Sequence, residues 1–168
     1  MPPASPSRLA QQAAAAHLQQ TDGVLRVRVV SGSMEPLLRA GDSVRVQPCA
    51  PAEVRPGDVL TMHSAGGWVT HRLMEITPQG WVLMGDASPW ADAPLPAEAL
   101  VGRVTGVWRG ETFQDWTQPP WQAEARHAAR RARQRYALVR LLQAGRYPPR
   151  RLSALLLRVL RRALAVLW

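Results

Sequence analysis

The stretch VLRVRVVSGSMEPLLRAGDSVRVQ, residues 24–47, contains two runs of alternating β-branched residues separated by a Ser-Gly-Ser turn and a Gly-Asp turn. Short alternating runs bounded by Gly, Asp and Pro are typical of antiparallel strands. The same pattern continues as far as Trp108. It predicts six strands: Val24–Val30, Ser43–Gln47, Asp58–His63, Trp68–Ile76, Trp81–Met84 and Leu100–Trp108. We therefore expect a mainly β domain over residues 23–117.

Helical segments are expected on both sides of this domain. Residues 1–22 begin with a loose Pro- and Ser-rich segment, followed by a short Ala/Gln helix from Ser7 to about Gln20. Residues 118–168 form an Arg-rich tail. One helix is predicted from Trp121 to Ala144, and a second from Arg150 to Trp168, because Gly145 and the Pro-Pro pair after it interrupt the helical pattern.

The positive charge is concentrated in this tail. All 21 basic residues are Arg, the acidic residues number 12, and the net charge is +9. Residues 1–121 carry a net charge of −2, whereas residues 122–168 carry +11. Because the sequence contains no lysine, mechanisms that need a lysine base, a Schiff base or a P-loop lysine are excluded.

The tail also suggests partners. Residues 150–168 form a basic amphipathic pattern, which predicts binding to an anionic membrane surface or packing against the β domain or a second copy. Nucleic acid is not an expected partner, because no DNA- or RNA-reading motif accompanies the arginines of residues 126–140. No signal peptide or membrane span is apparent, so a cytoplasmic or peripheral membrane location is expected. The oligomeric state is open.

Several short motifs along the β domain contain polar residues that could act in catalysis. A Ser-Gly-Ser-Met-Glu-Pro box ends at residue 36, and Gly-Asp pairs open two strands at residues 41–42 and 57–58. His71-Arg72 follows, then Gly85-Asp86 with Asp92 six residues further on, and finally a Gly-Arg-Val strand at residues 102–104. A serine hydroxyl needs a neighbouring base, and an imidazole base needs a third group that fixes its tautomer.

This order of boxes resembles the signal peptidase I clan of serine endopeptidases over about residues 24–108. The resemblance implies a signal peptidase/LexA-like twisted β-sheet or partial barrel. It also implies that Ser33 is the nucleophile and His71 the base, as in the histidine branch found in archaea and the endoplasmic reticulum, since the other branch uses lysine. The resemblance favours Asp92 as the group that orients His71, with Asp86 as the rival. The backbone N–H of Ser33 and the hydroxyl of Ser31 are the expected oxyanion donors, although Ser31 could equally be a turn-capping serine.

Other residues have plainer interpretations. His63 is the fallback base, and Arg72 is expected in a structural ion pair, because its side chain lies on the strand face opposite His71. Met34 and Val30 either line shallow substrate pockets or pack in the core. Cys49 is interpreted as a small apolar residue. No metal or cofactor is expected, because the His and Cys residues lack metal-ligand spacing.

The predicted function is that of a serine endopeptidase that cleaves a precursor or signal-type peptide after small residues. One alternative is a catalytically silent peptidase-like module that binds a membrane or protein partner through its basic tail. The other is a dedicated cytoplasmic maturation protease for one small precursor. The family's usual transmembrane anchor is not apparent, and this departure motivates both alternatives.

Overall fold

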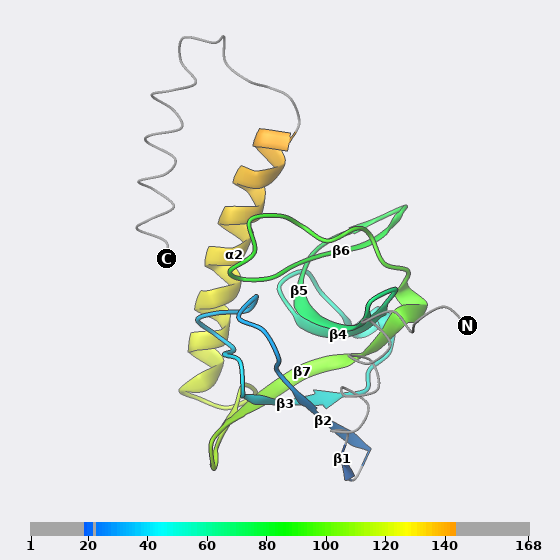
Figure 1. Ribbon diagram of the computed structural model, residues 1–168. Coiled ribbons are helices and arrows are strands. Elements are labelled where there is room, and N and C mark those ends of the chain that lie inside the picture. The colour runs from blue at the N-terminus through cyan, green and yellow to red at the C-terminus, as the bar shows by residue number, and fades with distance from the viewer. Residues whose placement is uncertain (1–18, 22, 144–168) are drawn as a thin grey trace, which may run out of the picture.

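The computed structural model describes residues 19–21 and 23–143 (Figure 1). The helix predicted at residues 150–168 and most of the helix predicted at Ser7–Gln20 lie outside these residues. The helix Trp121–Gln143, labelled α2, confirms the first of the two predicted tail helices to within one residue.

All described strands belong to one antiparallel sheet in the order β1-β2-β3-β7-β4-β5-β6, with β8 also paired to β7. Within the described part of the chain this sheet is open, because β1 and β6 form its two ends. The mainly β, signal peptidase/LexA-like class is therefore confirmed. The strands are β1 Gln19–Thr21, β2 Val24–Arg28, β3 Ser43–Gln47, β4 Val59–Ser64, β5 Gly67–Thr77, β6 Gly80–Met84, β7 Leu100–Arg109 and β8 Thr112–Asp115, with short 3-10 turns at Pro51–Glu53 and Ala97–Ala99.

The long strand β7 organises the sheet. One of its edges pairs with β3, from Ser43 opposite Trp108 to Gln47 opposite Arg103. Its other edge pairs first with β4 and then, after a change of partner, with β8. Register shifts interrupt the β3–β7, β4–β7 and β5–β6 ladders. Such shifts bend and twist strands.

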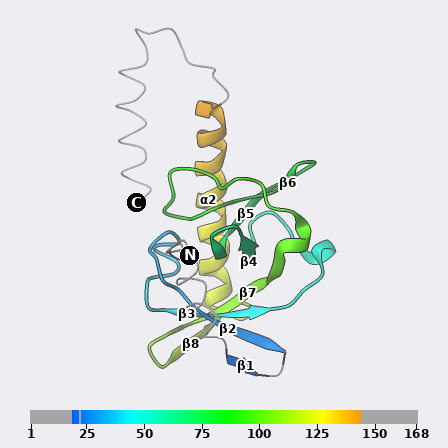
Figure 2. The ribbon, with the colours of Figure 1, turned by 45° about the vertical axis from the view of Figure 1, so that its right-hand side comes forward.

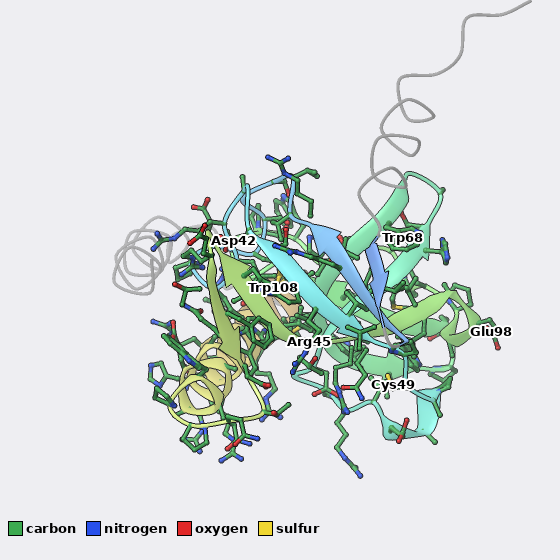
Figure 3. All side chains as sticks on the ribbon, turned by 90° about the horizontal axis from the view of Figure 1, so that it is seen from below. Asp42, Arg45, Cys49, Trp68, Glu98 and Trp108 are labelled. Atoms are coloured by element: carbon green, nitrogen blue, oxygen red, sulfur yellow. The ribbon has the colours of Figure 1, made fainter. Side chains whose placement is uncertain are left out.

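The strand residues alternate between a buried and a partly exposed face. In β3, Val44 and Val46 are fully buried, whereas Arg45 between them turns to the other face and pairs with Asp115 at 3.0 Å. Figure 3 shows Arg45 and Trp108 on the sheet, seen from below. Buried residues of the turn after β2 complete this core, and a second cluster lies between β4, β5 and β6.

Two strands, β1 and β8, were not predicted, and the helix predicted from Ser7 to about Gln20 was wrong at its end. Gln19 and Gln20 belong to β1, which pairs with β2 next to Gly23 at φ 74°, rather than to the end of a helix. Pairing with a neighbouring strand overrides the intrinsic helix preference of an Ala/Gln stretch. The other unpredicted strand, β8, forms a hairpin with β7 around Gly110 at φ 62°.

Helix α2 lies alongside the sheet in both ribbon views (Figures 1 and 2). Ala128 and Ala132 are its buried apolar contacts with the core clusters. At its far end Tyr136 donates a hydrogen bond to Glu75 of β5 at 2.9 Å, and Arg140 pairs with the same carboxylate. The helix is thus fixed to the strand that carries His71.

Candidate active site

Ser33 lies in a tight turn of the segment that joins β2 to β3. The turn is closed by hydrogen bonds from the Glu35 N–H to the Gly32 carbonyl and from the Leu38 N–H to the Met34 carbonyl, both at 3.0 Å. Met34 is 1% exposed and anchors the turn in the core. The serine next to this anchor therefore has a fixed position while remaining partly accessible.

His71 lies on β5 and faces Ser33. Its Nε2 atom is 2.9 Å from Ser33 Oγ, which is hydrogen-bond distance. The side chain of His71 is 12% exposed, so the imidazole is largely shielded from water. A base placed this close to a hydroxyl can accept its proton as the oxygen attacks.

Asp92 completes this chain of contacts. Its Oδ2 atom is 2.6 Å from His71 Nδ1, and its N–H donates to the Leu83 carbonyl at 2.8 Å. A carboxylate beside Nδ1 favours the tautomer in which Nδ1 carries the proton, which leaves Nε2 free to accept one from Ser33. The geometry thus brings the three predicted residues together.

Asp86, the rival third group, is engaged elsewhere. Its carboxylate accepts two hydrogen bonds from Arg72, from Nε at 2.8 Å and from Nη2 at 2.6 Å. Arg72 also donates to the Gly57 carbonyl at 2.8 Å, and the two side chains are 2% and 7% exposed. Arg72 therefore forms the structural ion pair expected of it, which ties β5 to the loop after β6.

That loop is held directly against the turn that carries Ser33. The Ala87 N–H donates to the Ser33 carbonyl at 2.8 Å, and the Asp86 N–H contacts Met34 Sδ at 3.4 Å. A Cβ on Gly85 would clash with the Ser33 carbonyl oxygen, at less than 3.0 Å, and would lie 3.2 Å from His71 Nε2. Only glycine allows this close approach. The Gly-Asp box marked the loop in the sequence but gave no sign of this contact.

Two groups near Ser33 could stabilise an oxyanion. The Ser31 and Ser33 hydroxyl oxygens are 3.2 Å apart. Within the described residues, the backbone N–H of Ser33 donates to no protein acceptor. Both donors named from the sequence thus lie next to the Ser33 hydroxyl, and no residue that the structure describes occupies the N–H.

Arg135 was missed as a residue that supports the site. Its guanidinium, 8% exposed, donates to the carbonyl oxygens of Asp86 and Ser88 and so fixes the loop that leads to Asp92. Burial lowers the pKa of Arg135, which the nearby Asp86 carboxylate partly offsets. The available sequence signal was its spacing of three and seven residues from Ala132 and Ala128, which places all three on one helix face.

The remaining sequence candidates lie apart from this chain of contacts. Met34 packs in the core and Val30 is 82% exposed. His63 is exposed and stacks edge-on against Trp68, and burial raises the pKa of the half-buried Cys49 thiol. Among the described residues, no group of three or more His, Cys, Asp or Glu could hold a metal ion. Residues 19–21 and 23–143 include no helix that is both long and apolar enough to cross a membrane.

Comparison with known proteins places this geometry in context. The chain is similar to Signal peptidase I W of Bacillus subtilis (strain 168), with 40% identity over 85 residues. The matched region is 46% of this chain and 45% of that protein, so the chain spans less than half of the relative's length. No protein-family model matches the chain. The similarity supports a relationship to signal peptidase I and a peptidase of that kind.

Proposed function

We propose that the protein is a serine endopeptidase of the signal peptidase I type that uses a histidine base and cleaves a precursor or signal-type peptide after small residues. The observation that carries the proposal is the contact chain from Ser33 Oγ to His71 Nε2 at 2.9 Å and from His71 Nδ1 to Asp92 Oδ2 at 2.6 Å. This arrangement of hydroxyl, imidazole and carboxylate activates serine on several unrelated folds. The similarity to Signal peptidase I W supports peptide hydrolysis as the reaction.

In the first half of the reaction, Ser33 Oγ attacks the scissile carbonyl carbon and His71 Nε2 takes the hydroxyl proton. The carbonyl oxygen becomes an oxyanion, which the Ser33 N–H and the Ser31 hydroxyl stabilise, each donor contributing about 3 kcal/mol. The C–N bond then breaks, and His71 returns the proton to the leaving amine. The product of this half is an ester between the substrate's acyl group and Ser33.

In the second half, a water molecule attacks the ester while His71 takes one of its protons. The ester bond breaks, the carboxylic acid product leaves, and His71 returns the proton to Ser33 Oγ. Asp92 keeps the Nδ1 proton of His71 in place through both halves. Asp86 has no step in this scheme, because Arg72 engages both of its carboxylate oxygens.

The histidine arrangement is supported by composition as well as by geometry. The sequence contains no lysine, so the lysine base of the other branch of the clan has no counterpart in it. Arginine is not a substitute, because its guanidinium stays protonated in proteins.

The test compares peptide N-termini by mass spectrometry in cells that express the wild-type protein or Ser33→Ala, with soluble and membrane fractions kept separate. We expect a set of N-termini preceded by small residues that disappears in Ser33→Ala. The matched control is Ser64→Ala, which changes a partly buried serine on β4 that contacts the Gly67 carbonyl instead of His71.

The outcomes separate the candidate functions. N-termini that depend on Ser33 but not on Ser64 support the peptidase, and a single cleaved precursor indicates a dedicated maturation protease. Identical N-termini in cells with wild-type and Ser33→Ala protein, both folded and present, contradict the proposal and favour a catalytically silent module.

A further inference from the structure

A cavity lined by arginines lies between α2 and the sheet. Its volume is about 640 Å³. Arg72 lines it, and because Arg72 and His71 are consecutive on β5, their side chains point to opposite faces of the strand. The cavity is therefore separate from the candidate active site. We refer to it as the arginine cavity and define it by its basic residues: Arg55, Arg72, Arg103, Arg126, Arg130 and Arg133.

Acidic side chains neutralise only part of this charge. Arg72 pairs with Asp86, and Arg103 lies 3.6 Å from Asp58, which is the one acidic residue among those that line the cavity. The other four arginines have no side-chain hydrogen bond or ion pair with any residue that the structure describes: Arg55, Arg126, Arg130 and Arg133. By contrast, Arg45, Arg109 and Arg140 each pair with a carboxylate elsewhere in the fold.

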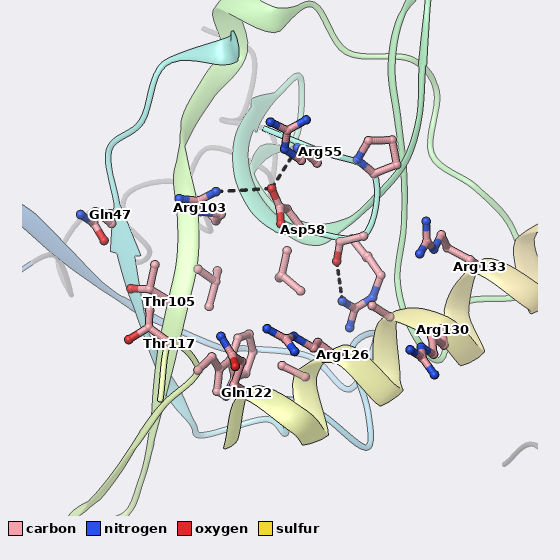
Figure 4. A pocket seen from close by; sticks show the side chains of 18 residues that line it. Gln47, Arg55, Asp58, Arg103, Thr105, Thr117, Gln122, Arg126, Arg130 and Arg133 are labelled. Atoms are coloured by element: carbon pink, nitrogen blue, oxygen red, sulfur yellow. Dashed lines mark hydrogen bonds and ion pairs between the residues drawn. The ribbon is translucent and has the colours of Figure 1, made fainter. Parts of the chain in front are cut away.

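Three of these four arginines are arranged in a row on α2. Arg126, Arg130 and Arg133 occupy positions i, i+4 and i+7 of α2, so they share one face and extend over about 10 Å of the helix axis. Figure 4 shows them along the helix, with Arg55 and Arg103 across the cavity. Like charges at this spacing destabilise an isolated helix. A bound anion would relieve their mutual repulsion.

Neutral hydrogen-bonding groups complete the lining. The side chains of Gln47, Thr105, Thr117 and Gln122 also face the cavity (Figure 4). Thr105 accepts a hydrogen bond from Arg45 at 2.8 Å, and Thr117 donates one to Asp115 at 2.6 Å, so both hydroxyls are already engaged. The groups left for a ligand are therefore mainly guanidinium and amide donors.

We propose that the arginine cavity binds a phosphate-bearing ligand with at least two anionic groups. A guanidinium donates two parallel hydrogen bonds to phosphate oxygens, and one phosphate can accept from several guanidinium groups at once. Four unpaired cations around one cavity require a denser negative charge than a single carboxylate supplies. A soluble polyphosphate moiety and an anionic phospholipid headgroup share this chemistry. The inference goes beyond the proposed peptidase activity and does not depend on it.

The first test measures binding of sodium tripolyphosphate to the full chain by isothermal titration calorimetry at fixed salt concentration. The cavity variant is Arg126→Gln/Arg130→Gln/Arg133→Gln. The matched control is Arg28→Gln/Arg39→Gln/Arg131→Gln, which removes the same charge from three exposed arginines outside the cavity. We expect saturable binding that weakens by about tenfold or more in the cavity variant and by less than about twofold in the control.

A second arm identifies the source of the phosphate. Cosedimentation of the same proteins is measured with phosphatidylcholine vesicles, with and without cardiolipin, a phospholipid whose headgroup carries two phosphates. Dependence of tripolyphosphate binding on the cavity arginines supports a soluble ligand. Dependence seen only with cardiolipin vesicles supports a lipid headgroup. Because all variants retain the basic residues 150–168, the difference between cavity variant and control isolates the cavity.

Two results would overturn the proposal. One is equal weakening in the cavity variant and the control in both arms, which would mean that binding follows net charge alone. The other is the absence of saturable binding by the wild-type chain in both arms. The three substituted arginines of the cavity are exposed, and a variant with lysine at all three positions checks that folding is retained. The lysine variant should bind more weakly than wild type but more tightly than the Gln variant.

Discussion

Replacement of Gly85 by alanine tests the positioning of Ser33, the proposed nucleophile. The new methyl group would lie closer than 3.0 Å to the Ser33 carbonyl oxygen and 3.2 Å from His71 Nε2, whereas ordinary contacts begin at 3.4 Å. Because the Ser33 carbonyl and the His71 ring are both packed within the site, the Gly85 loop and the Ser33 turn must move apart by several tenths of an ångström. A misplacement approaching 1 Å reduces catalysis by about 10²-fold. We expect kcat/KM to fall by about that factor.

The assay is the steady-state cleavage of a fluorogenic peptide that spans a cleavage site recovered from the N-terminal mass spectrometry. The matched control is Gly66→Ala, where a Cβ would have Ser64 Oγ as its nearest neighbour at 3.9 Å. Thermal unfolding by circular dichroism checks that both variants fold. If Gly85→Ala cleaves the peptide as fast as Gly66→Ala, the inference that this contact positions Ser33 is wrong.

Three further substitutions test the acidic residues. Asp92→Asn should lower kcat by about 10⁴-fold in the same assay with little change in Tm, because an amide favours the wrong imidazole tautomer; a small effect would contradict the orienting role. Asp86→Asn should instead lower the free energy of unfolding in urea by about 3–5 kcal/mol, because Arg72 would be left buried without a counter-charge; unchanged stability would contradict the structural role of the Arg72–Asp86 ion pair. Burial opposes ionisation of Asp42, but the hydrogen bonds from Arg109 and from the Arg39 N–H, together with the charges of both arginines, outweigh it and lower the pKa of that carboxyl. Its stabilising effect is therefore present above about pH 4 and is lost as the pH falls through the lowered pKa. In urea unfolding, Asp42→Asn should accordingly have a lower free energy of unfolding than wild type at neutral pH, and this difference should disappear in acid. A difference that does not change with pH would refute the stabilising role of the Asp42 carboxylate.

Much of the sheet could be predicted from the sequence, because its central strands alternate between buried and exposed residues. Val44 and Val46 on either side of Arg45 are an example. The missed strands lack this signal. Gln19–Thr21 contains no apolar residue, and its strand conformation comes from pairing with β2. The sequence of β1 alone therefore does not predict a strand, because its conformation depends on its partner β2.

The candidate site, like the sheet, could be predicted only in part. Ser33, His71 and Asp92 could be named from the order of the boxes, and the structure brings them within hydrogen-bond distance. Asp86 pairs with Arg72 and not with His71. Consecutive side chains of β5 point to opposite faces of the strand, so Arg72 and His71 contact different carboxylates.

The one sequence signal for Arg135 is the helix face that it shares with Ala128 and Ala132, and the sequence alone does not show which face of this arginine-rich helix is buried. The contacts of Arg135 with the carbonyl oxygens of Asp86 and Ser88 are set by how α2 packs on the sheet.

The central claim, that Ser33 is the nucleophile, is tested most directly by single-turnover cleavage of a recovered precursor by purified wild type, Ser33→Ala and Ser31→Ala. The two variants make the same chemical change two residues apart in one turn. We predict that Ser33→Ala abolishes cleavage, whereas Ser31→Ala, which removes one oxyanion donor, retains activity reduced by at most about 10³-fold. Cleavage by Ser33→Ala at the wild-type rate would contradict the account.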